Sequence, residues 1–198
     1  MPKTQYFVAT SIDGFIADSG NSLDWLFQAE AAAKAESASG DLYHDFYAQV
    51  GALAMGATTY EWVLGHEKLL DKPGSWPYSG RRCWVLSHRQ LPAVQGADIS
   101  FASGDVRAVH EQMLAAAGER NIWLVGGGDL VGQFADCGLL DEMIISIAPA
   151  TLGSGAPLLP RRLLPGELTL TRCADDGTFV HLSYTVSRSL SPANPSSG

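Results

Sequence analysis

The chain has 198 residues, enough for one domain with a sizeable core or at most two small ones, and its 46% hydrophobic and 17% charged residues are typical of a folded soluble protein. The formal net charge of -8 argues against a nucleic-acid surface or an anionic membrane as partner, because both require a dense positive patch. Cys83, Cys137 and Cys173 are widely spaced and predict neither a disulfide framework nor a metal site. The apolar stretch before Asp13 is too short for a signal peptide or a membrane span, so we expect a cytoplasmic protein.

The chain begins with a predicted strand over residues 6–10 and a turn-rich loop, SIDGFIADSGN, over residues 11–21. Because the loop contains apolar residues and leaves the end of a strand, it is either a lid over a ligand or a packed connection. A helix is expected to begin near Ser22 or Leu23, and the weak Ser/Gly patch at residues 37–40 predicts a break.

The next predicted helix, residues 41–50, carries two carboxylates one turn apart, Asp41 and Asp45. A carboxylate on the inner side of such a helix could bind a substrate N–H or supply a proton. The alternative is that Asp41 caps the helix and Asp45 lies on its solvated face.

Two strands that follow, residues 52–55 and 83–86, each end in a polar segment. GATTY follows the first strand and leads into a short predicted helix, whereas Ser87, His88 and Arg89 follow the second. The second segment could hold a phosphate ester or form an ordinary polar turn.

A glycine run lies between a strand and a helix further along the chain. Residues 122–125 (IWLV) predict a strand buried on both faces, and the apolar spacing of residues 129–137 predicts a helix, with Gly126, Gly127 and Gly128 between them. The first amides of a helix have no intrahelical partner and carry the positive end of the macrodipole, so they can receive a pyrophosphate. A tight turn with no ligand is the alternative. The run is not the GxGxxG fingerprint, which disfavours an ordinary Rossmann domain.

The remaining pattern completes a sheet. A short strand at residues 99–101 and a helix at residues 106–117 precede the glycine run, and a central strand at residues 142–149 follows it. Residues 168–171 and 179–186 predict a terminal hairpin.

Strands that alternate with helices and end in a hairpin predict an α/β fold, with a mainly parallel central sheet, helices on both faces and an antiparallel C-terminal edge hairpin. We expect one domain over residues 1–188 and a disordered tail over residues 189–198. Ligands of such folds bind at the carboxyl ends of the strands, where the segments after Thr10, Met55 and Leu86 would meet the glycine run. The hairpin and the edge strand could also pair between subunits, which predicts a homodimer.

The motifs SIDGFIA, MGATTYE, WVLSH, WLVGGGDL and PATLGSGAPLL occur in an order that resembles the dihydrofolate reductase superfamily, over roughly residues 5–187. The chain looks most like the stand-alone members grouped with the reductase domain of riboflavin biosynthesis, the RibD C-terminal domain, whose LGGGxPLF loop resembles LGSGAPLL here. The resemblance implies an eight-stranded, mostly parallel sheet with one antiparallel edge, and NADPH as the cofactor.

The resemblance also implies where the cofactor lies. The backbone at Ala9 and Ile16 would hold the nicotinamide carboxamide, residues 13–21 would form the lid, and two helix starts would meet the pyrophosphate. The family usually has a cis peptide bond in the glycine run, expected here at Gly126–Gly127. The segment after residue 86 matches the side of the adenosine 2′-phosphate. The expected cofactor-binding residues are Ala9, Ile16, Gly56, Thr58, Thr59, Leu86, Ser87, His88, Arg89, Val125, Gly126, Gly127, Gly128, Asp129, Leu130 and Val131.

For the substrate, the expected binding residues are Asp13, Trp25, Asp41, Phe46 and Arg81. Asp41 lies within one residue of the spacing of the folate-binding carboxylate, and Arg81 matches an arginine that pairs with the folate glutamate tail. Asp41 and Asp45 are the catalytic candidates, which would orient the substrate or relay the proton, with solvent as the alternative donor.

Several departures from the family bear on the ligands. Ala57 stands where dihydrofolate reductases often carry an arginine for the 2′-phosphate, for which Arg89 could compensate. Asp129 replaces a cation expected beside the glycines, so NADH stays open beside NADPH. Residues 21–40 lack the Trp-Asn-Leu-Pro-type sequence of folate enzymes. The riboflavin-pathway enzyme uses arginines early in the chain, whereas the first arginine here is Arg81.

The sequence therefore predicts an NADPH-dependent reductase that transfers hydride to a C=N or C=O of a small heterocyclic substrate, similar to 5-amino-6-(5-phosphoribosylamino)uracil reductase. The alternatives are a true dihydrofolate reductase and a non-catalytic NADP-binding module.

Overall fold

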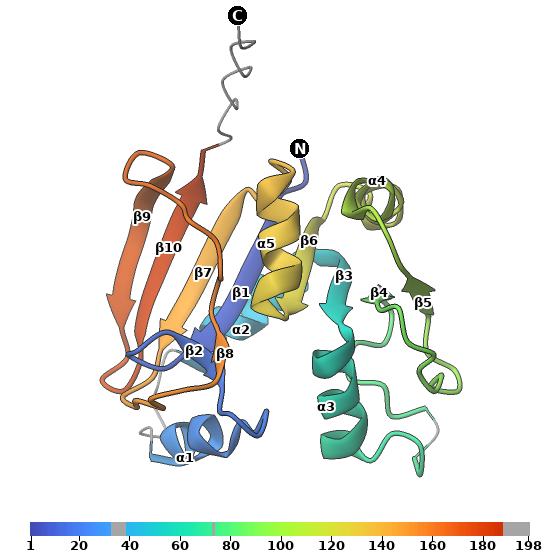
Figure 1. The fold of residues 1–198 in the computed structure, drawn as a ribbon, viewed down its shortest axis with the longest axis horizontal. Coiled ribbons are helices and arrows are strands. Elements are labelled where there is room, and N and C mark those ends of the chain that lie inside the picture. Colours follow the sequence, from blue (N-terminus) through green and yellow to red (C-terminus); the bar gives the residue numbers. More distant parts are fainter. Residues whose placement is uncertain (33–38, 73, 188–198) are drawn as a thin grey trace, which may run out of the picture.

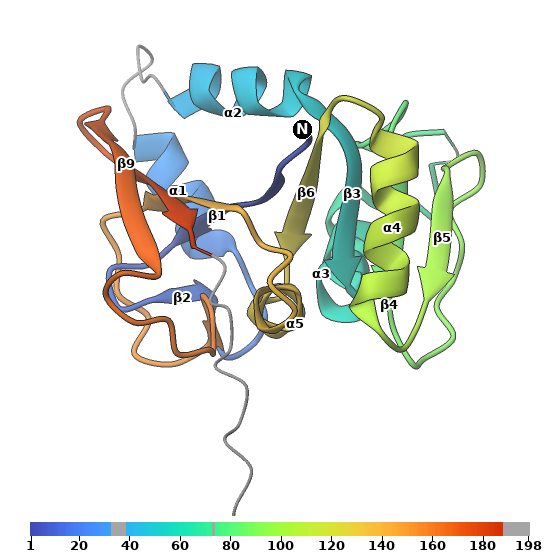
Figure 2. The same cartoon turned by 90° about the horizontal axis from the view of Figure 1, so that it is seen from above.

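The computed structural model describes residues 1–32, 39–72 and 74–187, with the side chains of residues 39–41 left out. Its elements form one central sheet with helices on both faces (Figures 1 and 2). In chain order they are β1 (Thr4–Thr10), β2 (Phe15–Ala17), α1 (Asp24–Ala32), α2 (Ser39–Ala48), β3 (Val50–Gly56), α3 (Ala57–Glu67), β4 (Arg82–Leu86), β5 (Ile99–Ala102), α4 (Val106–Ala117), β6 (Asn121–Gly126), α5 (Gly128–Asp136), β7 (Glu142–Ile147), β8 (Ala156–Pro157), β9 (Leu168–Asp175) and β10 (Val180–Val186).

The central sheet has eight strands in the order β5-β4-β3-β6-β1-β7-β10-β9. The strands from β5 to β7 pair in parallel, and β10 and β9 add an antiparallel edge. This arrangement confirms the predicted fold class, including the terminal hairpin. The β1–β7 register places Ala9 beside Ser146, and the β7–β10 register places Ser146 opposite His181.

Alternate residues of the inner strands supply two separate cores, because successive side chains of a strand point to opposite faces. Tyr6 and Leu124 belong to the core covered by α4 and α5, whereas Leu53 and Trp123 belong to the core covered by α2 and α3. Figure 2 shows α2 and α5 on opposite sides of the sheet. Phe134 of α5 is fully buried, and burying a side chain of this size contributes about 1.5–3 kcal/mol.

The parallel strands end at the lower edge of the sheet in Figure 1, where α1, α3 and the small sheet of β2 and β8 lie. That antiparallel pair was not predicted, and it joins the loop after β1 to the segment after β7. The close approach depends on Gly155, because a Cβ at that position would overlap the carbonyl oxygen of Ala17. Two segments far apart in sequence therefore lie together at the carboxyl edge of the sheet.

Two local predictions were wrong. The helix predicted over residues 41–50 ends at Ala48, because Val50 already pairs with Asn121 as the first residue of β3. The strand can begin there because Gly51 packs against the backbone of Ala117, 2.6 Å from where a Cβ would lie. No peptide bond of the described residues is cis, so the bond at Gly126–Gly127 is trans, with Gly127 at φ 88°.

Other predictions fall on residues that are not described. The tail over residues 189–198 lies outside the described part, as do residues 37 and 38 of the break predicted over residues 37–40, whereas residues 39 and 40 already belong to α2. Among the helices that are described, none is both long and apolar enough to cross a membrane.

Candidate functional site

A cavity of about 660 Å³ opens at the carboxyl edge of the sheet. Its walls come from the ends of β1, β6, β7 and β10 together with α1, α2, α3 and the start of α5. The lining residues are mostly apolar or aromatic, with a glycine corner at one end. They are Phe7, Val8, Ala9, Ile16, Ala17, Asn21, Leu23, Leu26, Phe27, Glu30, Tyr43, Thr58, Thr59, Trp62, Val63, Tyr78, Trp123, Val125, Gly126, Gly127, Gly128, Asp129, Ser146, Ala156, Pro157, Pro160, Phe179 and His181.

The glycine corner, Gly126–Gly128, leaves backbone open to the cavity. A Cβ at Gly126 would lie 3.1 Å from the Thr59 hydroxyl oxygen, so a side chain there would fill the space between the two helix starts. A Cβ at Gly128 would lie 2.6 Å from the carbonyl oxygen of Leu158. The corner therefore needs glycine both for the cavity and for the packing behind it.

Two helices begin at this corner without a side-chain cap. Gly56 precedes α3 and Gly127 precedes α5, and neither N-cap residue has a side chain that accepts a hydrogen bond from the first amides of its helix. Their first amides keep the donor capacity and the partial positive charge of a helix start. Both starts can therefore contribute donors to one anion.

A second pocket of about 250 Å³ adjoins the cavity and shares Thr58, Thr59, Gly127 and Asp129 with it. The segments that follow β3, β4, β5 and β6 all contribute to it. Its lining consists of Gly56, Ala57, Thr58, Thr59, Leu86, Ser87, His88, Ser103, Gly104, Gly127, Asp129, Leu130 and Gln133. The polar segments after β3 and β4 therefore meet the glycine corner, as the sequence predicts.

The structure brings most of the predicted cofactor residues to these two hollows, with two exceptions. Val131 is fully buried in the core beneath α5. Arg89 lies outside both linings, and its guanidinium donates two hydrogen bonds to the Glu61 carboxylate, at 2.9 and 2.8 Å. Among the described residues of the second pocket, His88 is the one side chain that can carry a positive charge.

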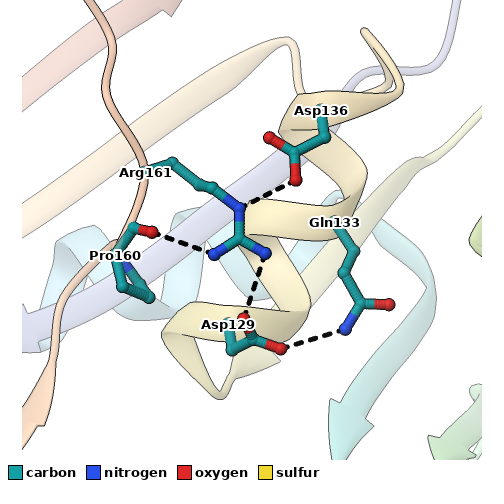
Figure 3. A network of polar contacts seen from close by, with 5 residues as sticks. All are labelled: Asp129, Gln133, Asp136, Pro160 and Arg161. Atoms are coloured by element: carbon teal, nitrogen blue, oxygen red, sulfur yellow. Dashed lines mark hydrogen bonds and ion pairs between the residues drawn. The ribbon is translucent and has the colours of Figure 1, made fainter.

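The carboxylate of Asp129 is held by neighbours on both sides (Figure 3). Gln133 donates to it at 3.0 Å and Arg161 donates at 3.0 Å, and these bonds lower the pKa of Asp129. Arg161 also donates to Asp136 at 2.8 Å and packs on Gly132, where a Cβ would lie 2.8 Å from the guanidinium carbon. The acid at the start of α5 is thus paired locally.

On the substrate side, the one predicted catalytic carboxylate whose side chain is described, Asp45, does not line the cavity. Asp45 is exposed and lies outside the lining, and the side chain of Asp41 is outside the described part of the chain. Phe46 is buried and stacks on Phe7, with ring centroids 4.6 Å apart. Trp25 packs beside a small core that contains Phe179. Phe46 and Trp25 therefore lie behind the wall of the cavity.

Arg81 does not reach the cavity either. Its guanidinium donates to the backbone carbonyls of Val50 and Tyr47, both at 2.9 Å, and lies over the Tyr47 ring at 3.8 Å. Through these bonds the guanidinium joins the end of α2 to the start of β3. The position does not support pairing with a folate tail.

Asp13 links two loops. Its carboxylate accepts bonds from the Ser11 hydroxyl at 2.6 Å and from the Gly153 amide at 2.7 Å, and the Leu152 amide also donates to it. The Ser11 and Gly153 bonds lower the pKa of Asp13. Asp13 thus fixes the loop after β1 to the segment before β8.

Several cavity residues were missed by sequence reasoning. Glu30 of α1 lines the rim, where partial burial raises its pKa. Phe27 and Trp62 each stack on His66, at centroid distances of 5.0 and 4.6 Å, and so connect α1 to α3 at the cavity. No motif marks these side chains, because they meet only through the packing of separate helices.

A polar chain lies among the cavity's apolar walls. Ser146 of β7 and His181 of β10 both line the cavity, with the hydroxyl oxygen 2.9 Å from Nδ1 of the imidazole. Nε2 of His181 lies 3.2 Å from the carboxylate of Asp176. The sequence signal for this trio is the long-range pairing of β7 with β10, which a single sequence does not display.

Comparison with known proteins agrees with this architecture. The family model described as the RibD C-terminal domain matches residues 63–182. The Bacillus subtilis (strain 168) protein YwjB is 34% identical over 182 residues, which cover 92% of this chain and 97% of that protein.

Solved structures give the same grouping. A Shewanella sp. PV-4 protein assigned to riboflavin biosynthesis superposes with a TM-score of 0.74 at 26% identity, over 94% of this chain and 99% of its own. Dihydrofolate reductase from Enterococcus faecalis, complexed with NADP(H), has a TM-score of 0.57 at 15% identity, over 93% of this chain and 96% of its own, which shows a shared fold. The family match and the sequence relative establish that this chain belongs to the RibD C-terminal domain family, and its fold is shared with dihydrofolate reductase.

Proposed function

We propose that this protein is a nicotinamide-dependent reductase that transfers hydride to a C=N or C=O carbon of a small heterocyclic substrate. The observation that carries the proposal is the glycine corner, where two cap-free helix starts open onto one large cavity. The related fold of dihydrofolate reductase from Enterococcus faecalis in complex with NADP(H) supports a dinucleotide as the occupant. The bound cofactor would supply the hydride, and the protein would supply orientation.

The residues present fit a dinucleotide. The amides at the starts of α3 and α5 are suited to a pyrophosphate, and the absence of a Cβ at Gly126 leaves room beside Thr59. Ala9 and Ile16 line the cavity on the side away from the second pocket, where the nicotinamide would lie. The second pocket would take the adenosine side.

The cofactor's phosphate preference depends on Arg89. Its pairing with Glu61 and the presence of Ala57 leave the second pocket without a free arginine among the described residues. NADPH remains the first candidate by family membership, and NADH is the alternative that this pairing favours.

The substrate side fits a flat ring. Phe7, Tyr43, Tyr78 and Trp123 line the cavity beside the sheet and offer faces and edges for stacking. Glu30 on the rim is the carboxylate of the described lining that could bind a ring N–H, a role that the sequence assigned to Asp41 or Asp45. An aminopyrimidine of the kind used in riboflavin biosynthesis matches this chemistry.

The proposal is tested in two steps. NADPH and NADH are titrated against tryptophan fluorescence, since Trp62 and Trp123 line the cavity, and oxidation of the tighter cofactor is then followed with aminopyrimidines, pteridines and folates. We expect binding together with turnover of at least one aminopyrimidine or pteridine. Tight binding without any turnover would support the non-catalytic module.

A matched pair of variants locates the binding site. Gly126→Ala puts a methyl group 3.1 Å from the Thr59 hydroxyl oxygen and should weaken cofactor binding about tenfold, or ~1.4 kcal/mol. Gly65→Ala, on α3 with open space around its Cβ position, should leave binding unchanged. Equal affinities for both variants would place the cofactor elsewhere.

A further inference from the structure

Three polar side chains form a hydrogen-bonded chain that ends in the cavity. Ser146 and His181 face each other across the β7–β10 pair, are 8% and 6% exposed, and both line the cavity. The Ser146 hydroxyl oxygen lies 2.9 Å from Nδ1 of His181. Nε2 of the same ring lies 3.2 Å from Asp176.

The carboxylate at the far end fixes the orientation of the imidazole. The Asp176 side chain is fully buried, and its other oxygen accepts the amides of Thr178 and Phe179 at 2.9 and 2.7 Å. An ionised carboxylate only accepts hydrogen bonds, so Nε2 of His181 carries a proton. Nδ1 then accepts from the Ser146 hydroxyl when the ring is neutral and donates to it when the ring is an imidazolium.

We propose that Asp176, His181 and Ser146 form a relay that delivers the proton accompanying hydride transfer. The inference rests on the proposed reductase function. Ser146 also lies beside Ala9 in the sheet, where the proposed function puts the nicotinamide, so its hydroxyl would be close to the reacting carbon.

The transfer is balanced as follows. Hydride from the reduced nicotinamide adds to the carbon of C=N or C=O, and the electron pair of the double bond moves to the heteroatom. The Ser146 hydroxyl gives its proton to that heteroatom and takes the Nδ1 proton of the His181 imidazolium. The products are the reduced substrate, the oxidised cofactor and a neutral His181 that is still bound to Asp176, and solvent then reprotonates the ring.

A purely structural role for the trio is the competing explanation. The backbone ladder between β7 and β10 already joins the two strands over six residue pairs. Strand pairing therefore does not depend on the hydrogen bonds among the three side chains. Burial of polar groups in a mostly apolar cavity carries a free-energy cost, which a function in the cavity would explain. Glu30 also lines the cavity and is the rival proton donor, which the kinetic comparison below separates.

The test uses the full chain and the panel member with the fastest turnover. Ser146→Ala should lower kcat on the order of 100-fold, the low end of the contribution from a positioned proton donor, with unchanged NADPH affinity. Ser146→Thr, which keeps the hydroxyl, should restore most of kcat. His181→Gln should lower kcat and raise the solvent deuterium isotope effect, because proton transfer then limits the rate.

Ser183→Ala is the matched control, since Ser183 lies on β10, the strand of His181, and outside the cavity lining. It should leave kcat and the isotope effect unchanged. Turnover in the parent protein with unchanged kcat in Ser146→Ala would overturn the relay alone. Absence of turnover with every panel member would overturn the reductase function, and the relay with it. If Ser146→Ala does not fold, unchanged kcat in His181→Gln overturns the relay equally.

Discussion

The two sides of the cavity are built in different ways. The side with the glycine corner is made of backbone at strand and helix ends, where Gly56, Gly126 and Gly127 leave amides uncovered. The opposite side is made of side chains from α1, α2, β7 and β10, such as Glu30 and His181. Backbone donors suit a constant ligand such as a dinucleotide, whereas side chains can change with the substrate. Under the proposed function, the first side would bind the cofactor and the second would bind the substrate.

The largest effect is expected at the back of the glycine corner. Gly128→Ala brings a Cβ against the carbonyl oxygens of Pro157 and Leu158, which are backbone atoms that cannot rotate away. We expect the free energy of unfolding to fall by about 3 kcal/mol, the upper part of the usual cost of overpacking. Urea unfolding measures it, and Gly65→Ala, with open space around it, is the control. A stable Gly128→Ala protein would mean that the packing behind the corner is looser than described.

The next effect belongs to the substrate side alone. Glu30→Gln should raise the KM of an amino-substituted heterocycle roughly tenfold, because a hydrogen bond to a charged group contributes about 1.5 kcal/mol or more. The affinity for NADPH should not change. Glu111→Gln, on the exposed face of α4, is the control for the loss of one negative charge. Weaker cofactor binding in Glu30→Gln would contradict the division of the cavity into two sides.

A smaller effect is expected on the cofactor side of the cavity, in the preference for NADPH over NADH. Glu61→Gln should release Arg89 and raise the preference for NADPH over NADH about threefold, within the 0.2–1 kcal/mol range of exposed ion pairs. Arg89→Ala should remove this gain when the two changes are combined. Fluorescence titration with both cofactors measures the ratio. A change of equal size in NADPH and NADH affinity would show that Arg89 does not contact the 2′-phosphate.

The smallest effect concerns the loop tie at Asp13. The hydrogen bond from the Ser11 hydroxyl, followed in size by that from the Gly153 amide, lowers the pKa of the Asp13 carboxyl. The anchoring by Asp13 is therefore fully present above the ordinary pKa of 3.8. It is lost as the pH falls through the lower pKa of the folded protein. Asp13→Asn should therefore lower the protection of the amides near Leu152 from hydrogen exchange at neutral pH. In the parent protein this protection should fall only in acid. Identical amide exchange in both proteins at neutral pH would show that Asp13 does not anchor the two loops to each other.

The contrast between the two sides also explains how far the sequence could be interpreted. The strand–glycine–helix corner and the helix over residues 106–117 depend on neighbouring residues and were predicted from local pattern, whereas the Asp105 N-cap of α4 was found only in the structure. The β2–β8 pair and the Ser146–His181 contact join residues far apart in sequence, which a single sequence does not display. The direction of side chains could not be predicted either. Helical spacing alone does not show that the side chain of Asp45 faces solvent.

Arg81 shows a third limit. An arginine at a position that matches a ligand-binding arginine was expected to bind ligand, but in this chain it donates to the carbonyls of Tyr47 and Val50. Unpaired carbonyls at a helix end are strong acceptors, so the same residue type can satisfy backbone instead of substrate. Residue type at a matched position therefore predicts a role only when the surrounding backbone is also known.

Arg161 gives α5 a brace along its length. Arg161 donates to Asp129 in the first turn and to Asp136 in the last, and packs on Gly132 between them, so it joins the helix to the segment that follows β8 (Figure 3). A helix held at both ends keeps the N–H groups of its first turn in a fixed orientation before a ligand binds. Less orientational freedom would then be lost on association, which would let the proposed dinucleotide bind without a large basic surface on this acidic protein.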